Sequence, residues 1–310
     1  MPQPLIECVP NFSEGRRADV IDQIVAAMRA VPDVLVLDVE SDADHNRSVV
    51  TLVGPPSAVV DGAFAGMRAA KELINLDEHR GEHPRLGATD VVPFIPIRDA
   101  TMADCVALAR QLGQRVGDEL GIPVYLYEEA ATRPARRNLA DVRRGEYEGL
   151  KQTLGTDPQR DPDFGPARLT PAGATAIGAR APLIAYNVYL STGDVDIAKK
   201  IAKVIRHSNG GLRFVKALGL LVEGHAQVSI NMTDFRSTPL HRVFELIRAE
   251  AARYGVLPTE SEIVGLVPED ALLDAAEHYL QLNRFKRSQV LERRLAEAEA
   301  AVQAGTTSDL

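Results

Sequence analysis

Apolar residues recur along this chain with alternating strand-like and helix-like periods. Strand-like segments in the first half are expected at 5–12, 34–39, 47–53, 91–97 and 124–127. Helix-spaced apolar residues lie at 20–31, 57–74 and 101–120, the first of them after a helix-start signal at Ser13. Up to residue 97 the order is β-α-β-β-α-β. This order is typical of the ferredoxin-like sandwich, in which helices cover one side of a mostly antiparallel sheet.

The same order returns in the second half. Strand-like segments are expected at 183–190, 214–222, 226–235 and 263–267. Helices are expected at 195–205, 240–254 and 269–282. The repeat predicts an α/β protein, of the α+β type, with two ferredoxin-like βαββαβ sandwich subdomains. We place the first at 1–180 and the second at 181–283. The remainder, 284–310, is expected to form a polar helical tail that is disordered from residue 305 onward.

The connection between the two repeats, residues 151–182, is rich in proline and glycine. A long segment without regular structure inside a compact protein is usually a functional loop or a disordered linker. Its turn residues are too specific, and its Ser, Lys and Glu too few, for a simple linker. We therefore expect it to line a ligand site between the two domains.

The composition narrows the function classes. The 310 residues carry a net charge of −8, whereas a nucleic-acid-binding protein needs a basic surface. The sequence has no apolar run of membrane-spanning length and no signal-peptide pattern. Cys8 and Cys105 both lie in apolar patterns, so we expect buried free thiols and a cytoplasmic protein.

The most polar loop, residues 79–90, follows a predicted helix and precedes a predicted strand. His79 and His83 enclose an H-x-x-E-H spacing that resembles a zinc-hydrolase signature. That signature needs a helix, but Gly81 lies within it and Pro84 disfavours a helical conformation at the residue before it. We therefore expect no metal here.

Without a metal, His83 has two interpretations. It is either a loop histidine bound to its own backbone or a general base, because an ordinary pKa near 6.5 suits proton transfer at neutral pH. Glu82 and Asp90 are candidates to orient it. A second polar cluster, residues 38–47, joins two predicted strands. It is either a solvated hairpin loop or part of a site that Asn11, at the end of the first strand, adjoins.

Several segments resemble the glutamate formimidoyltransferase family, the formiminotransferase half of formimidoyltransferase–cyclodeaminase. The most specific are Glu-Cys-Val-Pro-Asn-Phe-Ser-Glu-Gly at 7–15 and Gly-Glu-His-Pro-Arg at 81–85. Supporting segments lie at 46–47, 93–96, 123–127, 144–148, 163–166, 173–180 and 264–268. The resemblance covers residues 4 to 282 in the same order. The tail after Arg284 lies outside it, and the cyclodeaminase half is absent.

The resemblance implies two ferredoxin-like subdomains with a folate-binding tunnel between them, and transfer of a formimidoyl group from N-formimidoyl-L-glutamate to tetrahydrofolate in histidine breakdown. Tetrahydrofolate is then a co-substrate, no metal is needed, and a homodimer is expected. The family's catalytic histidine corresponds to His83. Its folate-binding loop corresponds to Asp163, Phe164, Gly165, Pro166, Ala167, Arg168, Leu169, Thr170, Pro171, Ala172, Gly173 and Ala174.

Position along the chain suggests further substrate-binding residues. The substrate carboxylates need cations, for which Arg47 and Arg85 are candidates, and a carboxylate of the 38–47 cluster is expected near the amidinium. The candidates are Asn11, Glu40, His45, Asn46, Arg47, Arg85 and Asp90. Two other function classes stay open, a 5-formyltetrahydrofolate cyclo-ligase-type enzyme and a non-catalytic small-ligand sensor. The sequence has no phosphate-binding loop for the nucleotide that the first needs, and a sensor needs no base such as His83.

Overall fold

The computed structural model describes residues 3–81 and 83–303. The chain divides into two compact units, Met1–Leu183 and Ile184–Leu310, and each is described by itself. The predicted role of Glu82 and the predicted disorder from residue 305 concern positions outside the described residues.

The first unit is built on one seven-stranded sheet. Its strands are β1 (Leu5–Cys8), β2 (Asn11–Phe12), β3 (Leu35–Asp42), β4 (Arg47–Gly54), β5 (Thr89–Arg98), β6 (Val124–Glu128) and β7 (Thr175–Ala179). Both β1 and β2 lie between β4 and β5, and β3 pairs with the other edge of β4. These strands are antiparallel and have the ferredoxin-like arrangement. Beyond β5, strands β7 and β6 continue the sheet in parallel pairing.

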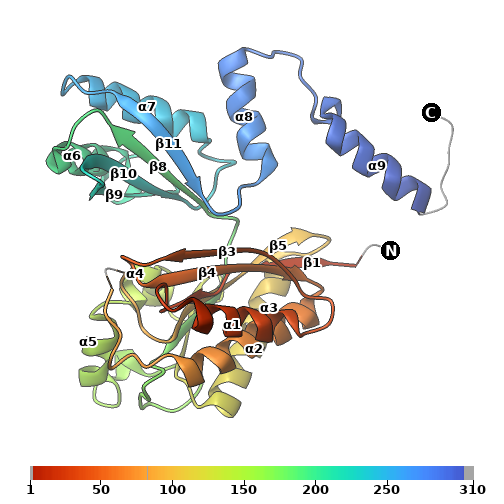
Figure 1. Cartoon of the computed structure of the whole chain (residues 1–310), viewed down its shortest axis with the longest axis vertical. Helices are drawn as coiled ribbons and strands as arrows, with labels where there is room; N and C mark the ends of the chain where they lie inside the picture. The colour runs from red at the N-terminus through yellow and green to blue at the C-terminus, as the bar shows by residue number, and fades with distance from the viewer. Residues whose placement is uncertain (1–2, 82, 304–310) are drawn as a thin grey trace. The chain divides into compact units, whose positions relative to one another are not determined.

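Helices cover the two faces of this sheet unequally. On one face lie α1 (Ala18–Arg29), α2 (Pro56–Leu73) and α3 (Met102–Arg115), which a π-helical turn, Val116–Leu120, extends (Figure 1). On the opposite face α4 (Leu139–Val142) and α5 (Glu146–Thr153) contribute to a smaller cluster. Strand β6 illustrates the division, because Leu126 belongs to the large core and its neighbours Tyr125 and Tyr127 belong to the small cluster.

Three sequence predictions for this unit need correction. The single strand expected at 5–12 is two strands, separated at Val9 and Pro10. Helix α1 begins at Ala18 and not directly after the predicted start signal at Ser13. The reason is that the Glu14 carboxylate accepts the backbone N–H groups of Arg16 and Arg17 at 2.9 Å. The segment 151–182, expected to lack regular structure, contains β7. That strand is fully buried, and its partners are more than 45 residues away, so local sequence gave little sign of it.

The second unit is a four-stranded antiparallel sheet in the order β11-β8-β10-β9. Its strands are β8 (Ile184–Leu190), β9 (Val215–Val222), β10 (His225–Met232) and β11 (Pro258–Val264). Its first three helices are α6 (Val195–Ile205), α7 (Leu240–Ala252) and α8 (Glu269–Leu280). The order matches the predicted ferredoxin-like sandwich. Strand β11 begins five residues before the predicted one, because its polar residues lie at an exposed sheet edge and carry no apolar signal.

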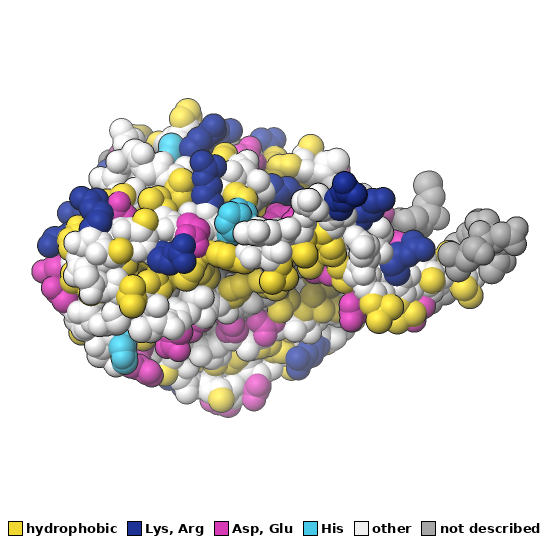
Figure 2. Space-filling view, turned by 90° about the horizontal axis from the view of Figure 1, so that it is seen from above, with side chains coloured by type: hydrophobic (Ala, Val, Ile, Leu, Met, Phe, Trp, Pro, Cys, Tyr) yellow, Lys and Arg dark blue, Asp and Glu magenta, His cyan; other side chains and the backbone are white. Residues whose placement is uncertain are grey.

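The tail forms helix α9 (Leu291–Gln303), which is attached to α8 by ion pairs. Arg293 donates to Glu269 at 2.6 Å and to Asp270 at 2.8 Å, and Arg287 donates to Glu277 at 3.2 Å. Acidic and basic side chains are interspersed over the face shown in Figure 2, with apolar side chains exposed between them. No helix in the described part of the chain is long and apolar enough to cross a membrane. Both cysteines are buried and unpaired, as predicted.

Candidate active site

His83 lies on the loop between α2 and β5, against two strands of the first sheet. Its Nε2 is 3.3 Å from Nη1 of Arg47, on β4, and the same Nη1 donates to Oδ1 of Asn11, on β2, at 3.2 Å. Asn11 is the register partner of Val91, whose side chain belongs to the cluster under α4 and α5. The site is therefore on the face opposite α1–α3. A guanidinium has only donors, so this contact uses Nε2 of a neutral imidazole as the acceptor.

An ion-pair network around the buried Arg85 side chain shapes the loop that carries His83. Arg85 donates to Glu146 at 3.1 Å and to both carboxylate oxygens of Glu148, at 2.9 and 2.7 Å. Its Nε donates to Nδ1 of His79 at 3.2 Å, and Nε2 of His79 contacts the carbonyl of Asn46 at 3.0 Å. These contacts fix the loop to α5 and to the β3–β4 turn. Because the Arg85 guanidinium is largely engaged, its predicted role as a substrate ligand does not fit this geometry.

Asp90 has a second partner that the sequence did not suggest. One of its carboxylate oxygens accepts the backbone N–H of Leu86 at 2.8 Å, and the other accepts from Nη2 of Arg143, at the end of α4. Asp90 thus holds Arg143 beside the His83 loop. Arg143 directly precedes the family-like segment 144–148, and that position was the one sequence signal for it.

Burial and two cations determine the protonation of His83. Burial first, then the positive charges of Arg47 and Arg143, lower the pKa of His83 to about 2. The ordinary pKa near 6.5 on which the sequence argument relied therefore does not apply to the free protein. Within the described residues, the Nε groups of Arg47 and Arg143 are buried and have no hydrogen-bond partner. The site thus combines a neutral imidazole with two guanidinium groups whose Nε donors have no acceptor among residues 3–81 and 83–303.

Strand β3 and the β3–β4 turn hold the remaining predicted substrate residues. Glu40 is the register partner of Val49, as is Asn11, so the Glu40 side chain is on the same face of the sheet as Asn11. Nδ1 of His45 is 2.7 Å from Oδ2 of Asp42, in an exposed pair. Asn46 has a structural position instead, since its amide links the backbone N–H of Gly15 to the carbonyl of Arg80, both at 2.9 Å.

The predicted folate loop has two structurally different parts. Its first residues secure the edge of the sheet, where the Asp163 carboxylate accepts from Arg136 at 2.5 Å and from the backbone N–H of Leu126 at 2.8 Å. Both charged side chains are buried. The carbonyl of Phe164 accepts the backbone N–H of Val124 at 2.9 Å. Residues 166–169 are half-buried or exposed.

The last residues of this loop lie directly beside the His83 loop. The backbone N–H of Ala88 donates to Ala172 at 2.8 Å, and that of Ala174 donates to Leu86 at 3.0 Å. Gly173 has φ +70°, and a Cβ at this position would lie 2.2 Å from the carbonyl oxygen of Leu86. The turn at 170–174 therefore needs glycine to approach the His83 loop this closely.

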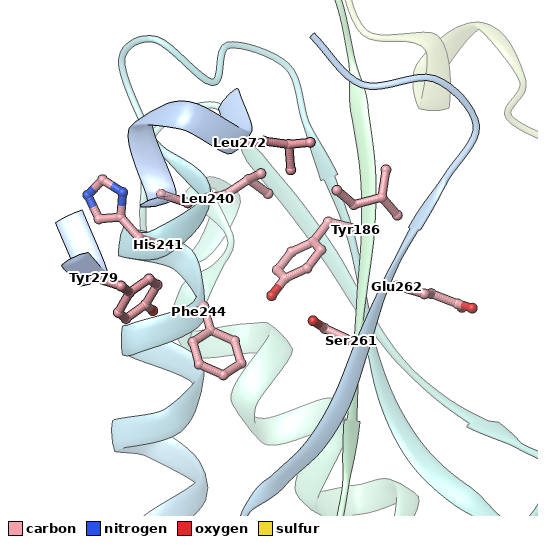
Figure 3. A pocket seen from close by; sticks show the side chains of 10 residues that line it. Tyr186, Leu240, His241, Phe244, Ser261, Glu262, Leu272 and Tyr279 are labelled. Atoms are coloured by element: carbon pink, nitrogen blue, oxygen red, sulfur yellow. The ribbon is translucent and has the colours of Figure 1, made fainter. Parts of the chain in front are cut away.

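A hollow of about 410 Å³ lies in the second unit, between α7, α8 and β11 (Figure 3). Its walls are mostly apolar, with the hydroxyls of Tyr186 and Ser261 directed toward each other. At its rim, the ring of His241 stacks on that of His278 at 4.1 Å. All of its lining residues differ from the predicted site residues, and they bring no base next to a set of anion-binding donors.

A metal site is also absent among residues 3–81 and 83–303, where no group of three or more His, Cys, Asp or Glu side chains is placed to hold an ion. The described residues of the 79–83 stretch form turn and loop rather than helix.

Comparison with known families accounts for the family-like segments found in the sequence. The N-terminal subdomain of the formiminotransferase domain matches residues 5–180, and the formiminotransferase domain model that follows it matches residues 185–299. The chain belongs to the formiminotransferase family. The second match extends to residue 299, so the prediction that the family pattern ends near residue 282 was wrong. Helix α9 lies mostly within the family domain.

Relatives of this formiminotransferase-family chain include proteins of similar length. It is 56% identical to a glutamate formimidoyltransferase of Thermoplasma acidophilum, over 95% of this chain and 98% of that one. It is 50% identical to a glutamate formimidoyltransferase of Streptococcus pyogenes, over 94% and 98%. It is 47% identical to the formimidoyltransferase-cyclodeaminase of Gallus gallus, over 91% of this chain but 53% of that one. The chain therefore spans about half the length of the bifunctional relatives.

Proposed function

We propose that this chain is a glutamate formimidoyltransferase, which transfers the formimidoyl group of N-formimidoyl-L-glutamate to N5 of tetrahydrofolate and releases L-glutamate in histidine degradation. The observation that carries the proposal is the pair of relatives with this name, 56% and 50% identical over nearly the whole chain. Tetrahydrofolate is a co-substrate, since it receives the transferred group. The relatives described above favour neither a cyclo-ligase nor a sensor.

The reaction requires two proton transfers. N5 of tetrahydrofolate attacks the amidine carbon, and the bond from that carbon to the glutamate nitrogen then breaks. N5 loses a proton and the departing nitrogen gains one, so a single group that accepts the first proton and donates the second balances the reaction. We assign this role to His83, because its Nε2 is a neutral acceptor at a site lined by polar side chains of two strands.

The neighbouring side chains fit the remaining parts of the substrate. Arg47 provides a positive charge for a carboxylate next to His83. Asn11 provides an amide beside it, and Glu40 provides a negative charge on the same face of the sheet for the protonated amidine. His45, at the β3–β4 turn, lies at the edge of this group. We assign Asn46, Arg85 and Asp90 to holding the site rather than to touching the substrate.

For the folate, we propose the loop 163–174. Among its last five residues, Ala172 and Ala174 are hydrogen-bonded to the loop of His83, and the half-buried or exposed residues 166–169 precede them. A cofactor bound there comes close to the histidine, and such positioning of two reactants contributes a large part of the rate. Asp163 contributes by holding the start of the loop at the sheet edge.

We also propose a cytoplasmic homodimer. Two buried, unpaired cysteines are typical of a reducing compartment. The dimer is supported by large apolar side chains exposed on α8 and α9, among them Leu280, Leu291 and Leu295. Sedimentation equilibrium of the full chain tests it, since a mass of 33.6 kDa at all concentrations would contradict it.

The test of the proposed function is one assay with purified protein, tetrahydrofolate and N-formimidoyl-L-glutamate. We expect release of glutamate that depends on tetrahydrofolate, and no release would refute the proposal. The variant His83→Ala should lower kcat by about 10²–10⁴-fold while folate still binds, because general acid–base catalysis is worth that much. His207→Ala, a change at an exposed histidine, is the matched control and should keep full rate. Full rate in His83→Ala would show that another group is the base.

A further inference from the structure

Two arginines at the His83 site retain a donor that the described protein does not use. Arg47 comes from β4, and its Nη1 contacts Asn11 and His83. Arg143 comes from the end of α4, and its Nη2 contacts Asp90. The Nε of each is buried without a partner in residues 3–81 and 83–303. A buried donor without an acceptor is costly, and a buried charge more so, which indicates that an anion binds here.

Charges of both signs surround Arg47. The positive charge of Arg143 acts on Arg47, and the acidic groups acting on Arg47 are Asp90, Asp42 and Glu40. Of these, Asp90 is paired with Arg143, and Asp42 is paired with His45.

His83 itself faces positive or neutral partners. They are Arg47, Arg143, His45 and His79, from β4, α4, the β3–β4 turn and its own loop. Glu82, the preceding residue, lies outside the described part of the chain. The described groups that act on His83 thus include two cations, and Asp90, Asp42 and Glu40 act in turn on Arg47.

We propose that Arg47 and Arg143 together bind one carboxylate of the glutamyl substrate, and that this carboxylate activates His83 by balancing the two cations beside it. The inference rests on the proposed function for the identity of the substrate. Arg143 is a substrate-binding residue here, and through the carboxylate it also controls the base.

This arrangement links substrate choice to catalysis. In the free protein burial first, and then the two cations, keep the pKa of His83 low, so the imidazole is a weak base. A bound carboxylate offsets part of that effect, since an opposite charge within about 4–6 Å shifts a pKa by about 1–3 units. An analogue with an amide in place of this carboxylate should therefore be a poor substrate for two reasons. It leaves buried guanidinium donors poorly paired, and it leaves His83 weakly basic.

A pH titration followed by NMR tests the proposal without turnover. It uses the full-length protein with labelled histidine and no tetrahydrofolate. L-glutamate, the reaction product, is the probe. We expect saturating glutamate to raise the pKa of His83 by about 1–3 units. Glutamine, without the γ-carboxylate, and isoglutamine, without the α-carboxylate, identify the carboxylate involved, because the analogue that lacks it should give no shift. No change at His83 with saturating glutamate would overturn the proposal, as would equal shifts with both analogues.

The variant Arg143→Met keeps the side-chain stem and removes the charge. It should weaken glutamate binding by about 10–100-fold, since hydrogen bonds to charged groups contribute about 1.5–3 kcal/mol. It should also raise the pKa of His83 in the free protein. Arg144→Met is the matched control, because the neighbouring Arg144 side chain is exposed and pairs with Asp141. Equal effects of the two variants would contradict the proposal.

If Arg143→Met does not fold, as judged by circular dichroism, the wild-type titration still decides, and Arg143→Lys keeps the charge without the guanidinium. Failure of the inference and failure of the proposed function give different results. Glutamate that shifts His83 in a protein without transferase activity would support the carboxylate site and refute the transferase. Transferase activity without that shift would support the transferase and refute the carboxylate site.

Discussion

At the scale of single residues, the environment of His83 decides what this histidine does. The residue type suggests a base that titrates near neutral pH, but burial and two arginines lower the pKa of His83 to about 2 in the free protein. The imidazole is therefore neutral across the physiological range. Its basicity then depends on what binds beside it, which the residue type alone does not specify.

This low pKa predicts a dependence of stability on pH. Above about pH 6.5 His83 is neutral in both the folded and the unfolded chain, and it contributes nothing. Below that pH only the unfolded chain takes up the proton, so stability falls as the pH falls toward the folded-state pKa. In His83→Gln, the loss of unfolding free energy between pH 7 and pH 5 should be smaller than in the wild type, by at most about 2 kcal/mol.

Urea unfolding at the two pH values measures this difference. His207→Gln, a change at an exposed position, is the control and should leave the difference between pH 7 and pH 5 unchanged. An equal loss in wild type and His83→Gln would mean that His83 takes up its proton in the folded protein as readily as in the unfolded chain.

At the same scale, two arginines differ in how far their donors are used within the protein. Arg85 stands two residues after His83 and was a natural candidate for the substrate carboxylate. Its guanidinium instead donates to Glu146 and Glu148, which are more than 60 residues away. Arg143 has a buried donor without a partner among the described residues, and it reaches the site only because α4 packs on this face of the sheet.

At the scale of elements, the turn at 170–174 connects the predicted folate loop to the catalytic loop. It forms backbone hydrogen bonds with Leu86 and Ala88, and then continues as β7 between β5 and β6. A shift in this turn therefore moves the loop that carries His83. Gly173 is the position where the two backbones come closest.

We therefore predict that Gly173→Ala lowers both stability and activity. Alanine in the left-handed region costs about 1–2 kcal/mol, and here its Cβ would also lie 2.2 Å from the carbonyl oxygen of Leu86. Gly121→Ala is the matched control, since Gly121 has φ +63° and no atom within 4 Å of a built Cβ. Urea unfolding should give a clearly larger loss for Gly173→Ala, and the transferase assay should fall only for that variant. Equal losses would mean that the loops separate without cost.

At the scale of the whole molecule, the two units have separate cores. The core of the second unit is drawn entirely from residues 184–271, and both clusters of the first unit come from residues 6–179. The two matching family models divide at nearly the same place, between residues 180 and 185. A hydrophobic core formed only by residues of one segment is the physical basis of a separate domain.

A fragment of residues 184–303 should therefore fold alone. We expect the circular dichroism of a mixed α/β protein and a single cooperative thermal transition, because the sheet and its covering helices are complete within the fragment. The matching fragment 1–183 is the comparison. A fragment 184–303 without a cooperative transition would show that the second unit depends on the first for its stability.

The sequence by itself determined most of the fold, because strand and helix periods are local properties. The ferredoxin-like strand order of both units, helices α1–α3 and α6–α8 and the two buried cysteines followed from apolar spacing, whereas α4 and α5 did not. The same reading missed β7, where a short run of small residues becomes a strand only by pairing with distant β5 and β6. It also placed β11 too late, because an edge strand rich in polar residues has no apolar pattern.

For the candidate site, the sequence singled out the loop at 79–90, since a cluster of charged residues with Gly81 and Pro84 is visible locally. Only the tertiary structure decided which charges meet. It joined Arg85 to α5, set Arg47 and Arg143 beside His83, and used Asn46 to hold two loops together. Charge interactions act through space and depend on burial. A list of residues therefore gives the candidates, whereas the packing of β4, α4 and the His83 loop gives the neutral base and the donors around it.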